Sequence, residues 1–196
     1  GHVNVVKELL KRGAEIEAED NHGGTALYTA AGGGHEKVVV ELLKNNAEIE
    51  ATSADGFTPL MIAAQEGHAN AVKELLQRGA TIEASTPAGT TSLISASMNG
   101  HVNTVKELLQ RGADIEASTA DGATSLMFAS HNGHVNVVKE LLQRGADIEA
   151  STAAGATSLM VASQNGRVNV VKELLDNGAD IEACDPDGVT SLIAAS

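Results

Sequence analysis

Apolar residues recur along the chain in short segments that have the spacing of a helix, and most of these segments end at a glycine. Within residues 119–151 this spacing predicts a helix over about 135–144, with an apolar face formed by Val135, Val138, Leu141 and Leu142. Gly145 is expected to end this helix. The polar residues of the same segment are expected to point away from the apolar face: Lys139, Glu140, Gln143 and Arg144.

A shorter helix is predicted before it, over residues 125–131. Thr124 precedes this segment and is a suitable N-cap, because a threonine hydroxyl accepts an N–H group of the first helical turn. Asn132 and Gly133 both tolerate the left-handed conformation and are expected to end the helix.

Two connecting segments complete the unit. Asp121 and Gly122 favour positive φ and predict a turn before the first helix. After the second helix, residues 146–152 are expected to return in an extended conformation, because Ile148 alternates there with acidic residues.

The same pattern recurs every 33 residues along the whole chain. The segment KELLQRGADIEAST occurs without change from Lys106 to Thr119 and from Lys139 to Thr152. Two helices this short cannot bury their apolar sides within one unit, whereas stacking on neighbouring units buries them. The sequence therefore predicts one all-α domain built as a solenoid. Gly-His pairs, and finally Gly-Arg, mark the period at Gly1, Gly34, Gly67, Gly100, Gly133 and Gly166.

Residues 55–84, with the sequence DGFTPLMIAAQEGHANAVKELLQRGATIEA, resemble the ankyrin repeat. They contain Thr-Pro-Leu, then Gly-His, then Leu-Leu and Gly-Ala in the order of that family. The resemblance implies stacked helix–turn–helix units with β-hairpin-like fingers on one side. It also implies a concave face, formed by the fingers and the first helices, that binds other proteins without catalysis.

The units depart from the ankyrin pattern in three ways. The family's proline survives only at Pro59, so a small loss of preorganisation is expected elsewhere. The family's asparagine in the return segment is glutamate throughout, from Glu17 to Glu182, which leaves no substrate for asparaginyl hydroxylation. Apolar packing is expected in place of a polar network where the family's histidine is replaced, at Tyr28, Met61, Ile94, Met127, Met160 and Ile193.

The phase of the family divides the chain into five full repeats between two half repeats. The half repeats leave apolar side chains uncovered at both ends. We therefore expect a piece of a longer array or an engineered, library-derived one, and molecules that associate end to end through these uncapped half repeats. The division is 1–19, 20–52, 53–85, 86–118, 119–151, 152–184 and 185–196.

Composition limits the partners that the chain can bind. Its 13 Lys and Arg residues against 26 Asp and Glu residues give a net charge of −13, spread evenly along the sequence. Nucleic acid and anionic membrane surfaces require basic patches, so neither is expected as a partner. The expected partner is a protein or peptide of basic or mixed charge. The single Cys184 suits a reducing, intracellular compartment.

Three features that could suggest chemistry have simpler structural explanations. The histidines recur once per unit, and stacked helices about 8–10 Å apart cannot bring two of them to one metal ion. A hydrogen bond near the helix start is expected instead, with Arg167 in the same place. The segment AGGGH at 31–35 lacks the Lys-Ser/Thr of a phosphate loop. The acidic pairs such as Asp114 and Glu116 read as solvated loops, and no nucleophile motif occurs. No enzyme activity, metal or cofactor is expected.

The units differ from one another mainly in the fingers and near the end of the first helix. Under the ankyrin resemblance these positions line the concave face; the alternative is neutral variation on an exposed surface, in a scaffold with no natural ligand. Phe57, Met98 and Phe128 are the best candidates for anchors. The candidate partner-binding residues are Asp55, Phe57, Gln65, Glu66, Thr90, Met98, Asn99, Asp121, Phe128, His131, Asn132, Gln164 and Asn165.

Overall fold

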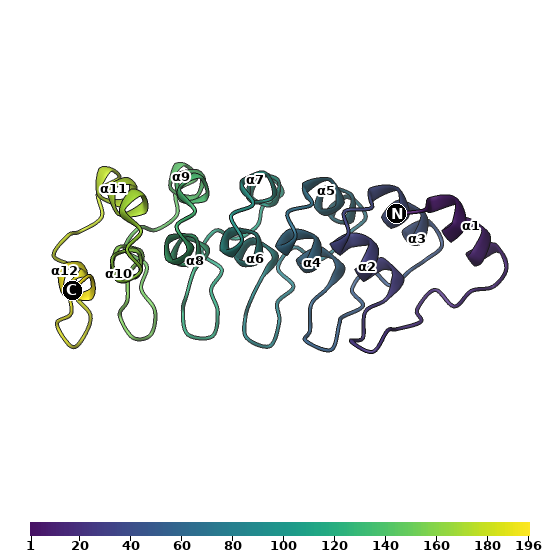
Figure 1. Cartoon of the computed structure of the whole chain (residues 1–196), viewed down its shortest axis with the longest axis horizontal. Coiled ribbons are helices and arrows are strands. Elements are labelled where there is room, and N and C mark those ends of the chain that lie inside the picture. Colours follow the sequence, from purple (N-terminus) through teal and green to yellow (C-terminus); the bar gives the residue numbers. More distant parts are fainter.

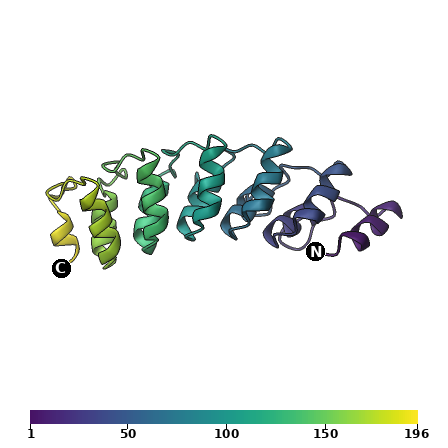
Figure 2. The ribbon, with the colours of Figure 1, turned by 90° about the horizontal axis from the view of Figure 1, so that it is seen from above.

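The computed structural model describes residues 1–196 as two stacked rows of helices, with loops projecting from one row (Figure 1). Helices that follow one another in a row are 33 residues apart in sequence, so the predicted solenoid is confirmed. Seen from above, the array arches gently from end to end (Figure 2). The first-helix row consists of α2 (Ala26–Gly32), α4 (Pro59–Gln65), α6 (Ser92–Met98), α8 (Ser125–Asn132), α10 (Ser158–Gln164) and α12 (Ser191–Ala194). The second-helix row consists of α1 (Val3–Lys11), α3 (Glu36–Lys44), α5 (Ala69–Gln77), α7 (Val102–Gln110), α9 (Val135–Gln143) and α11 (Val168–Asp176).

The predicted pair of helices in residues 119–151 corresponds to α8 and α9. Gly133 follows α8 with φ of 82° and Gly145 lies just beyond α9 with φ of 88°, so both glycines end their helices in the left-handed conformation, as predicted. No helix is long and apolar enough to span a bilayer.

The N-cap assignment holds for the backbone but not for the hydroxyl of Thr124. Thr124 has the extended conformation of an N-cap, yet its buried hydroxyl makes no hydrogen bond. The equivalent threonine caps its helix in the other units, as in Thr58, whose Oγ1 accepts the N–H of Met61 at 3.3 Å. The prediction is therefore wrong for the unit on which it was made and right for the others, at Thr25, Thr58, Thr91, Thr157 and Thr190.

The return segment is a turn, which corrects the expected extended conformation. Ile148 and Glu149 form the turn, and the N–H of Ala150 donates to the carbonyl of Asp147 at 3.3 Å. The carboxylate of Asp147 also accepts the N–H of Glu149 at 3.0 Å, which holds the turn locally. Ile148 is still half-buried between exposed acidic residues, so the alternation seen in the sequence reflects burial without an extended backbone.

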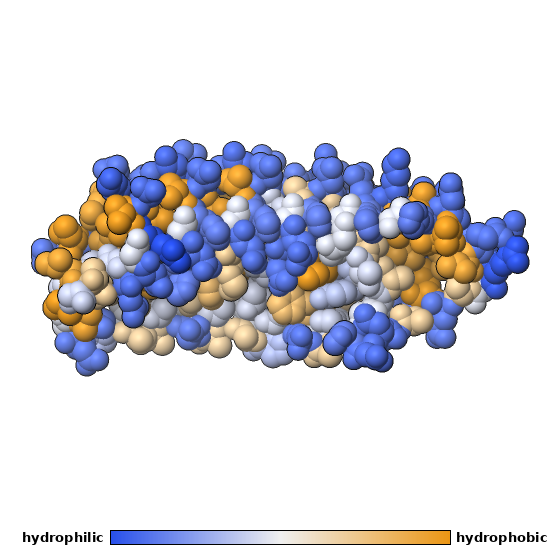
Figure 3. Space-filling view, in the orientation of Figure 1, coloured by the Kyte–Doolittle hydropathy of each residue, from blue (hydrophilic) through white to orange (hydrophobic).

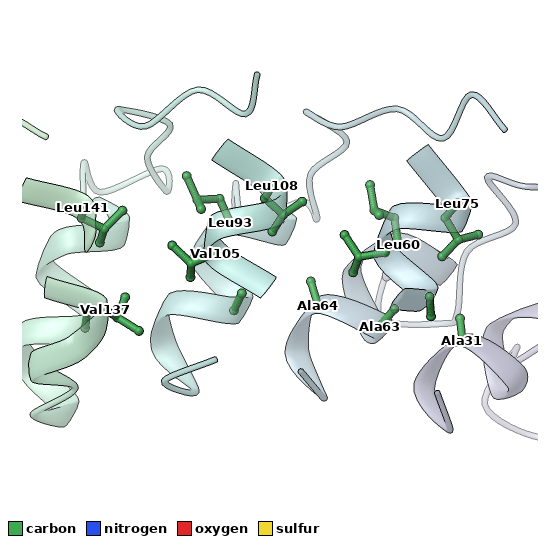
Figure 4. Close-up of a cluster of buried hydrophobic side chains, with 14 of the residues drawn as sticks. Ala31, Leu60, Ala63, Ala64, Leu75, Leu93, Val105, Leu108, Val137 and Leu141 are labelled. Atoms are coloured by element: carbon green, nitrogen blue, oxygen red, sulfur yellow. The ribbon is translucent and has the colours of Figure 1, made fainter. Parts of the chain in front are cut away.

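The core is a continuous column of small and branched apolar residues between the two rows of helices (Figure 4). Leu60, Leu93 and Leu126 of the first-helix row are almost completely buried, and so are Leu75, Leu108 and Leu141 of the second-helix row. Alanines such as Ala63 and Ala96 let neighbouring first helices approach closely. At the position of the replaced histidine, four of the six residues are buried as predicted, outside this column: Met61, Ile94, Met127 and Met160. Tyr28 is only half-buried, and the prediction is wrong for Ile193, which is exposed in the last half repeat.

Two residues of α9 depart from the predicted helical face. Val137 is fully buried, although the periodicity left it off the apolar face. Glu140 is 8% exposed and does not point away from the array. Its carboxylate lies 3.0 Å from Nε of Arg144 and 3.6 Å from Nζ of Lys106, so two cations compensate the buried charge.

Candidate protein-binding surface

The fingers and the first-helix row form one side of the array, here called the finger face: residues 20–33, 53–66, 86–99, 119–132, 152–165 and 185–196. Each finger is a tight turn closed by its own backbone. In the unit 119–151, the N–H of Gly122 donates to the carbonyl of Thr119 at 2.9 Å, and the N–H of Thr119 donates to the carbonyl of Ala123 at 3.0 Å. The Oγ1 of Thr119 accepts the N–H of Ala123 at 3.2 Å, so the short polar residue at the start of the finger fixes its shape.

Neighbouring fingers are joined by backbone hydrogen bonds between their tips. The N–H of Ala54 donates to the carbonyl of His22 at 2.9 Å, and the N–H of Ala153 donates to that of Asp121 at the same distance. The Ala120–Ala88 bond, at 3.1 Å, is the third of this kind. Two fingers have proline at the donor position, Pro87 and Pro186, and proline has no N–H to donate.

None of the candidate partner-binding residues is buried. The finger residues Asp55 and Asp121 are exposed, and Phe57 and Thr90 are half-buried. At the end of the first helices, one group is exposed: Glu66, Asn99, His131 and Gln164. The rest are half-buried: Gln65, Met98, Phe128, Asn132 and Asn165. All are therefore partly accessible on the side of the array to which the resemblance assigned them.

The structure brings several of these residues together across the units. The Nδ2 of Asn132 donates to the carbonyl of Met98 at 2.9 Å, and the Nδ2 of Asn165 lies 3.2 Å from Nδ1 of His131. Within one unit, Nε2 of Gln65 donates to the carboxylate of Glu66 at 3.1 Å. The finger residues are not bonded to these helix residues.

The apolar candidates divide into a pair and a separate residue. A Cβ built on Gly32 would lie 3.0 Å from Cγ1 of Ile62, so these two positions face each other across neighbouring first helices. Met98 and Phe128 occupy the same two positions 66 residues later, and the register of the repeat therefore places them side by side. Phe57 follows the tip of a finger and lies apart from this pair.

Positive charge is segregated from the finger face. Every lysine and arginine lies in the second-helix row or at its caps, and none lies in the finger face. Arg167, at the start of α11, touches the face from its edge, where its Nε donates to the carbonyl of His131 at 2.8 Å. Figure 3 shows hydrophilic residues crowded over the second-helix row, a paler band below it, and apolar residues gathered at the two ends of the array.

Two finger carboxylates have pKa values held below the ordinary range. The pKa of Asp20 is lowered by N–H groups of Gly24 and His22, which donate to Oδ1 at 2.9 and 2.8 Å. The pKa of Asp121 is lowered mainly by a hydrogen bond from the hydroxyl of Thr119. These hydrogen bonds favour the ionised form of both carboxylates.

The histidines serve the joints between units. The Nε2 of His134 lies 2.9 Å from the carbonyl of Met98, as expected for a structural histidine near a helix start. Arg167 makes the equivalent bond in the next unit, which confirms its assignment to the same place. The expected hydrogen bond is wrong for His2, His35, His68 and His101, which make none; the rings of His35, His68 and His101 lie instead against glycines of the preceding unit. No three His, Cys, Asp or Glu side chains are grouped so as to hold a metal ion.

The glutamates of the return segment also have a role that the sequence analysis missed. Oε1 of Glu116 accepts the N–H of Asp147 at 2.8 Å, which joins one return turn to the next. Their recurrence at one position of every unit was the available signal. The same bond joins other neighbours, at Glu17–Glu48, Glu50–Thr81, Glu83–Asp114 and Glu149–Asp180.

Comparison with protein families finds ankyrin repeats along the chain. One family model, described as ankyrin repeats (3 copies), matches residues 1–86, 39–119 and 82–152. A second, described as ankyrin repeats (many copies), matches residues 141–195. A comparison with curated proteins found no match.

Proposed function

Because the chain belongs to the ankyrin repeat family, whose members are generally protein-binding modules without catalytic activity, we propose that it binds a protein or peptide through its finger face. The observation that carries this proposal is the segregation of charge. The face contains acidic residues but no lysine or arginine, whereas the opposite row contains all the cations. A partner segment of basic or mixed charge complements such a surface.

The acidic residues at the fingertips alternate along the array. Asp55, Asp121 and Asp187 occupy the same position in every second unit, with Ala88 and Ala154 between them. Because stacked helices lie about 8–10 Å apart, these carboxylates are about 16–20 Å apart. Cations separated by that distance along a partner would meet one carboxylate each.

Apolar anchors lie between these charges. Phe57, Met98 and Phe128 are half-buried, so each has apolar surface left to bury against a partner. Aromatic side chains contribute much of the binding free energy in interfaces, and methionine adapts to irregular surfaces. The remaining candidate residues surround these anchors and supply polar contacts.

A peptide-display selection on the immobilised chain tests this proposal. We expect enrichment of peptides rich in Lys and Arg, and loss of their binding in a variant with Phe57→Ala, Met98→Ala and Phe128→Ala. The matched control removes three exposed apolar side chains that lie outside the finger face, with Leu9→Ala, Val168→Ala and Ile181→Ala. It should leave binding intact. Far-UV circular dichroism confirms that both variants remain folded. Failure to enrich any peptide would instead support a scaffold with no natural ligand, library-derived or engineered.

End-to-end association of molecules is a separate proposal. Large apolar side chains are exposed near both ends of the array, among them Leu9 at 53% and Leu192 at 81%. Stacking one end on the other would bury them in a heterologous contact. Light scattering tests this, because the proposal predicts a mass that rises with concentration, and a constant monomer mass contradicts it.

A further inference from the structure

The polar links between neighbouring units are unevenly distributed. The units 86–118 and 119–151 are joined at every level of the array, from the fingertips to the second helices. The links are Ala120 N–H to Ala88 carbonyl at 3.1 Å, Asp147 N–H to Glu116 at 2.8 Å, Lys106 to Glu140 at 3.6 Å, and Asn132 and His134 to the Met98 carbonyl, both at 2.9 Å.

The joint between the units 119–151 and 152–184 is equally well linked. Its fingertip, return-turn and second-helix bonds occupy the same positions, and Arg167 replaces the histidine. The links are Ala153 to Asp121 at 2.9 Å, Asp180 to Glu149 at 2.8 Å, Lys139 to Glu173 at 3.4 Å, Arg167 to the His131 carbonyl at 2.8 Å, and Asn165 to the His131 ring at 3.2 Å.

The joint between the units 53–85 and 86–118 retains only one of these links. The N–H of Asp114 donates to Glu83 at 2.9 Å. The fingertip bond is absent because Pro87 has no N–H. Asn99 donates to the carbonyl of Ser95 in its own helix, at 2.9 Å, and not to the preceding unit.

The second helices at this joint are likewise not linked. Lys73 and Glu107 occupy the positions of the Lys106–Glu140 pair but form no ion pair, and Glu107 pairs with Arg111 of its own helix at 3.0 Å. The preceding joint also has no ion pair between its second helices, because Val40 occupies the position of Lys106. It differs from the joint between the units 53–85 and 86–118 in one respect, since it keeps its fingertip bond, from Ala54, in addition to its return bond, from Thr81.

The unit that follows the joint contains buried hydroxyl groups without partners. They are Ser92, Ser95, Ser97 and Thr104, whereas neither the unit 20–52 nor the unit 53–85 has any. A buried unpaired hydroxyl costs about 1–3 kcal/mol. The unit 119–151 has three such groups, at Thr124, Ser125 and Ser130, so the unit that follows the joint has the most of any full unit, and these groups lower its stability.

Apolar packing continues across the joint. Leu60 and Ala64 on one side and Leu93 and Val105 on the other belong to the same buried column (Figure 4). The hydrophobic effect is not directional, whereas hydrogen bonds fix orientation. This joint keeps its apolar packing but only one of the hydrogen bonds, so the two bodies stay together while the angle between them is less firmly fixed.

We propose that the array bends at this joint, as a hinge between residues 1–85 and the block formed by residues 86–184. The hinge divides the finger face, with Phe57 on one body and both Met98 and Phe128 on the other. The curvature of the face is therefore adjustable at one defined place. This inference concerns the chain alone and stands independently of the partner proposed above.

Spin labels on the full chain test the hinge. In a Cys184→Ser background, one label pair at Gln77 and Gln143 spans the proposed hinge and one well-linked joint. A matched pair at Gln110 and Asp176 spans two well-linked joints over the same number of residues, and all four positions are exposed. Double electron–electron resonance should give a broader distance distribution for the first pair. Equal widths for the two pairs would overturn the proposal.

A second variant tests the cause. In the linked joints the fingertip donor is an alanine, so Pro87→Ala installs the same donor at the hinge. We expect it to narrow the distribution of the Gln77–Gln143 pair and leave that of the Gln110–Asp176 pair unchanged. If both distributions stay as they were, the missing fingertip bond does not set the bending, and that part of the inference is wrong.

Discussion

His134 packs against Gly100 of the preceding unit so closely that a Cβ on Gly100 would lie 2.6 Å from Nδ1 of the imidazole. Gly100 also has φ of 77°, which L side chains rarely adopt. The glycines of four Gly-His pairs, Gly1, Gly34, Gly67 and Gly100, receive the imidazole ring of the next unit in this way, and Gly133 receives the side chain of Arg167. This contact between units explains why the Gly-His pair recurs every 33 residues.

Gly100→Ala is predicted to destabilise the array through this joint. Gly112→Ala is the matched control, because Gly112 has φ of 89° but no atom within 4 Å of a built Cβ. In both variants an alanine must adopt positive φ, which lowers stability. Only Gly100→Ala also introduces a steric clash with the ring of His134. Urea unfolding should show Gly100→Ala to be less stable than Gly112→Ala by about 1–3 kcal/mol. Equal losses would mean that the ring moves aside at no cost.

Thr104→Val is predicted to stabilise the chain. The hydroxyl of Thr104 is buried without a partner, and Val137 and Val170 occupy the same position in the next units. Removing the unpaired hydroxyl while keeping the branched shape should raise the free energy of unfolding by about 1 kcal/mol. Thr52→Val, at an exposed position, should leave it unchanged. A loss of stability in Thr104→Val would show that the hydroxyl has a partner such as a water molecule.

Ser158→Pro is also predicted to stabilise. Ser158 is the first residue of α10, its hydroxyl is buried and unpaired, and Pro59 occupies the same position in α4. Thr157 before it is extended, with ψ of 167°, as a residue preceding proline must be. Thermal unfolding should show a gain of about 1 kcal/mol. The Ser158→Ala variant removes the hydroxyl without adding the proline ring. If Ser158→Pro is less stable than Ser158→Ala, the prediction is wrong.

Thr119→Val is predicted to raise the pKa of Asp121 toward the ordinary carboxyl value. The Thr119 hydroxyl bond favours the ionised form, so its contribution to stability is present above the ordinary pKa of about 3.9 and disappears as pH falls through the lowered folded value. An NMR titration of the side-chain carboxyl carbons measures this. The pKa of Asp20, lowered by backbone N–H groups, should not change in the variant. An unchanged Asp121 pKa would assign the shift to another cause.

The repeat period and the two helices of each unit were predictable because they depend on local spacing and on glycines. The turn at Ile148 and Glu149 was not, because exposure alternates in a turn as it does in a strand. The burial of Glu140 depends on Lys106, a residue of the neighbouring unit, and no pattern within one helix reveals it. The candidate residues could be placed on one side of the array from the resemblance to the ankyrin repeat. The uneven distribution of links between units could be found only from the structure. Pro87 has an effect there because the carbonyl of the neighbouring finger is left without an N–H donor.

The central claim is that the finger face, through its negative charge, binds a basic partner. Calorimetric titration of a display-selected basic peptide into two variants of equal net charge tests it most directly. One variant carries Asp55→Asn, Glu66→Gln and Asp121→Asn on the finger face. The other carries Glu15→Gln, Glu36→Gln and Asp176→Asn, at exposed positions away from it. The account predicts a loss of affinity of about tenfold or more in the first, or 1.4 kcal/mol, and little change in the second. Equal losses in both variants, or no loss in either, would contradict it.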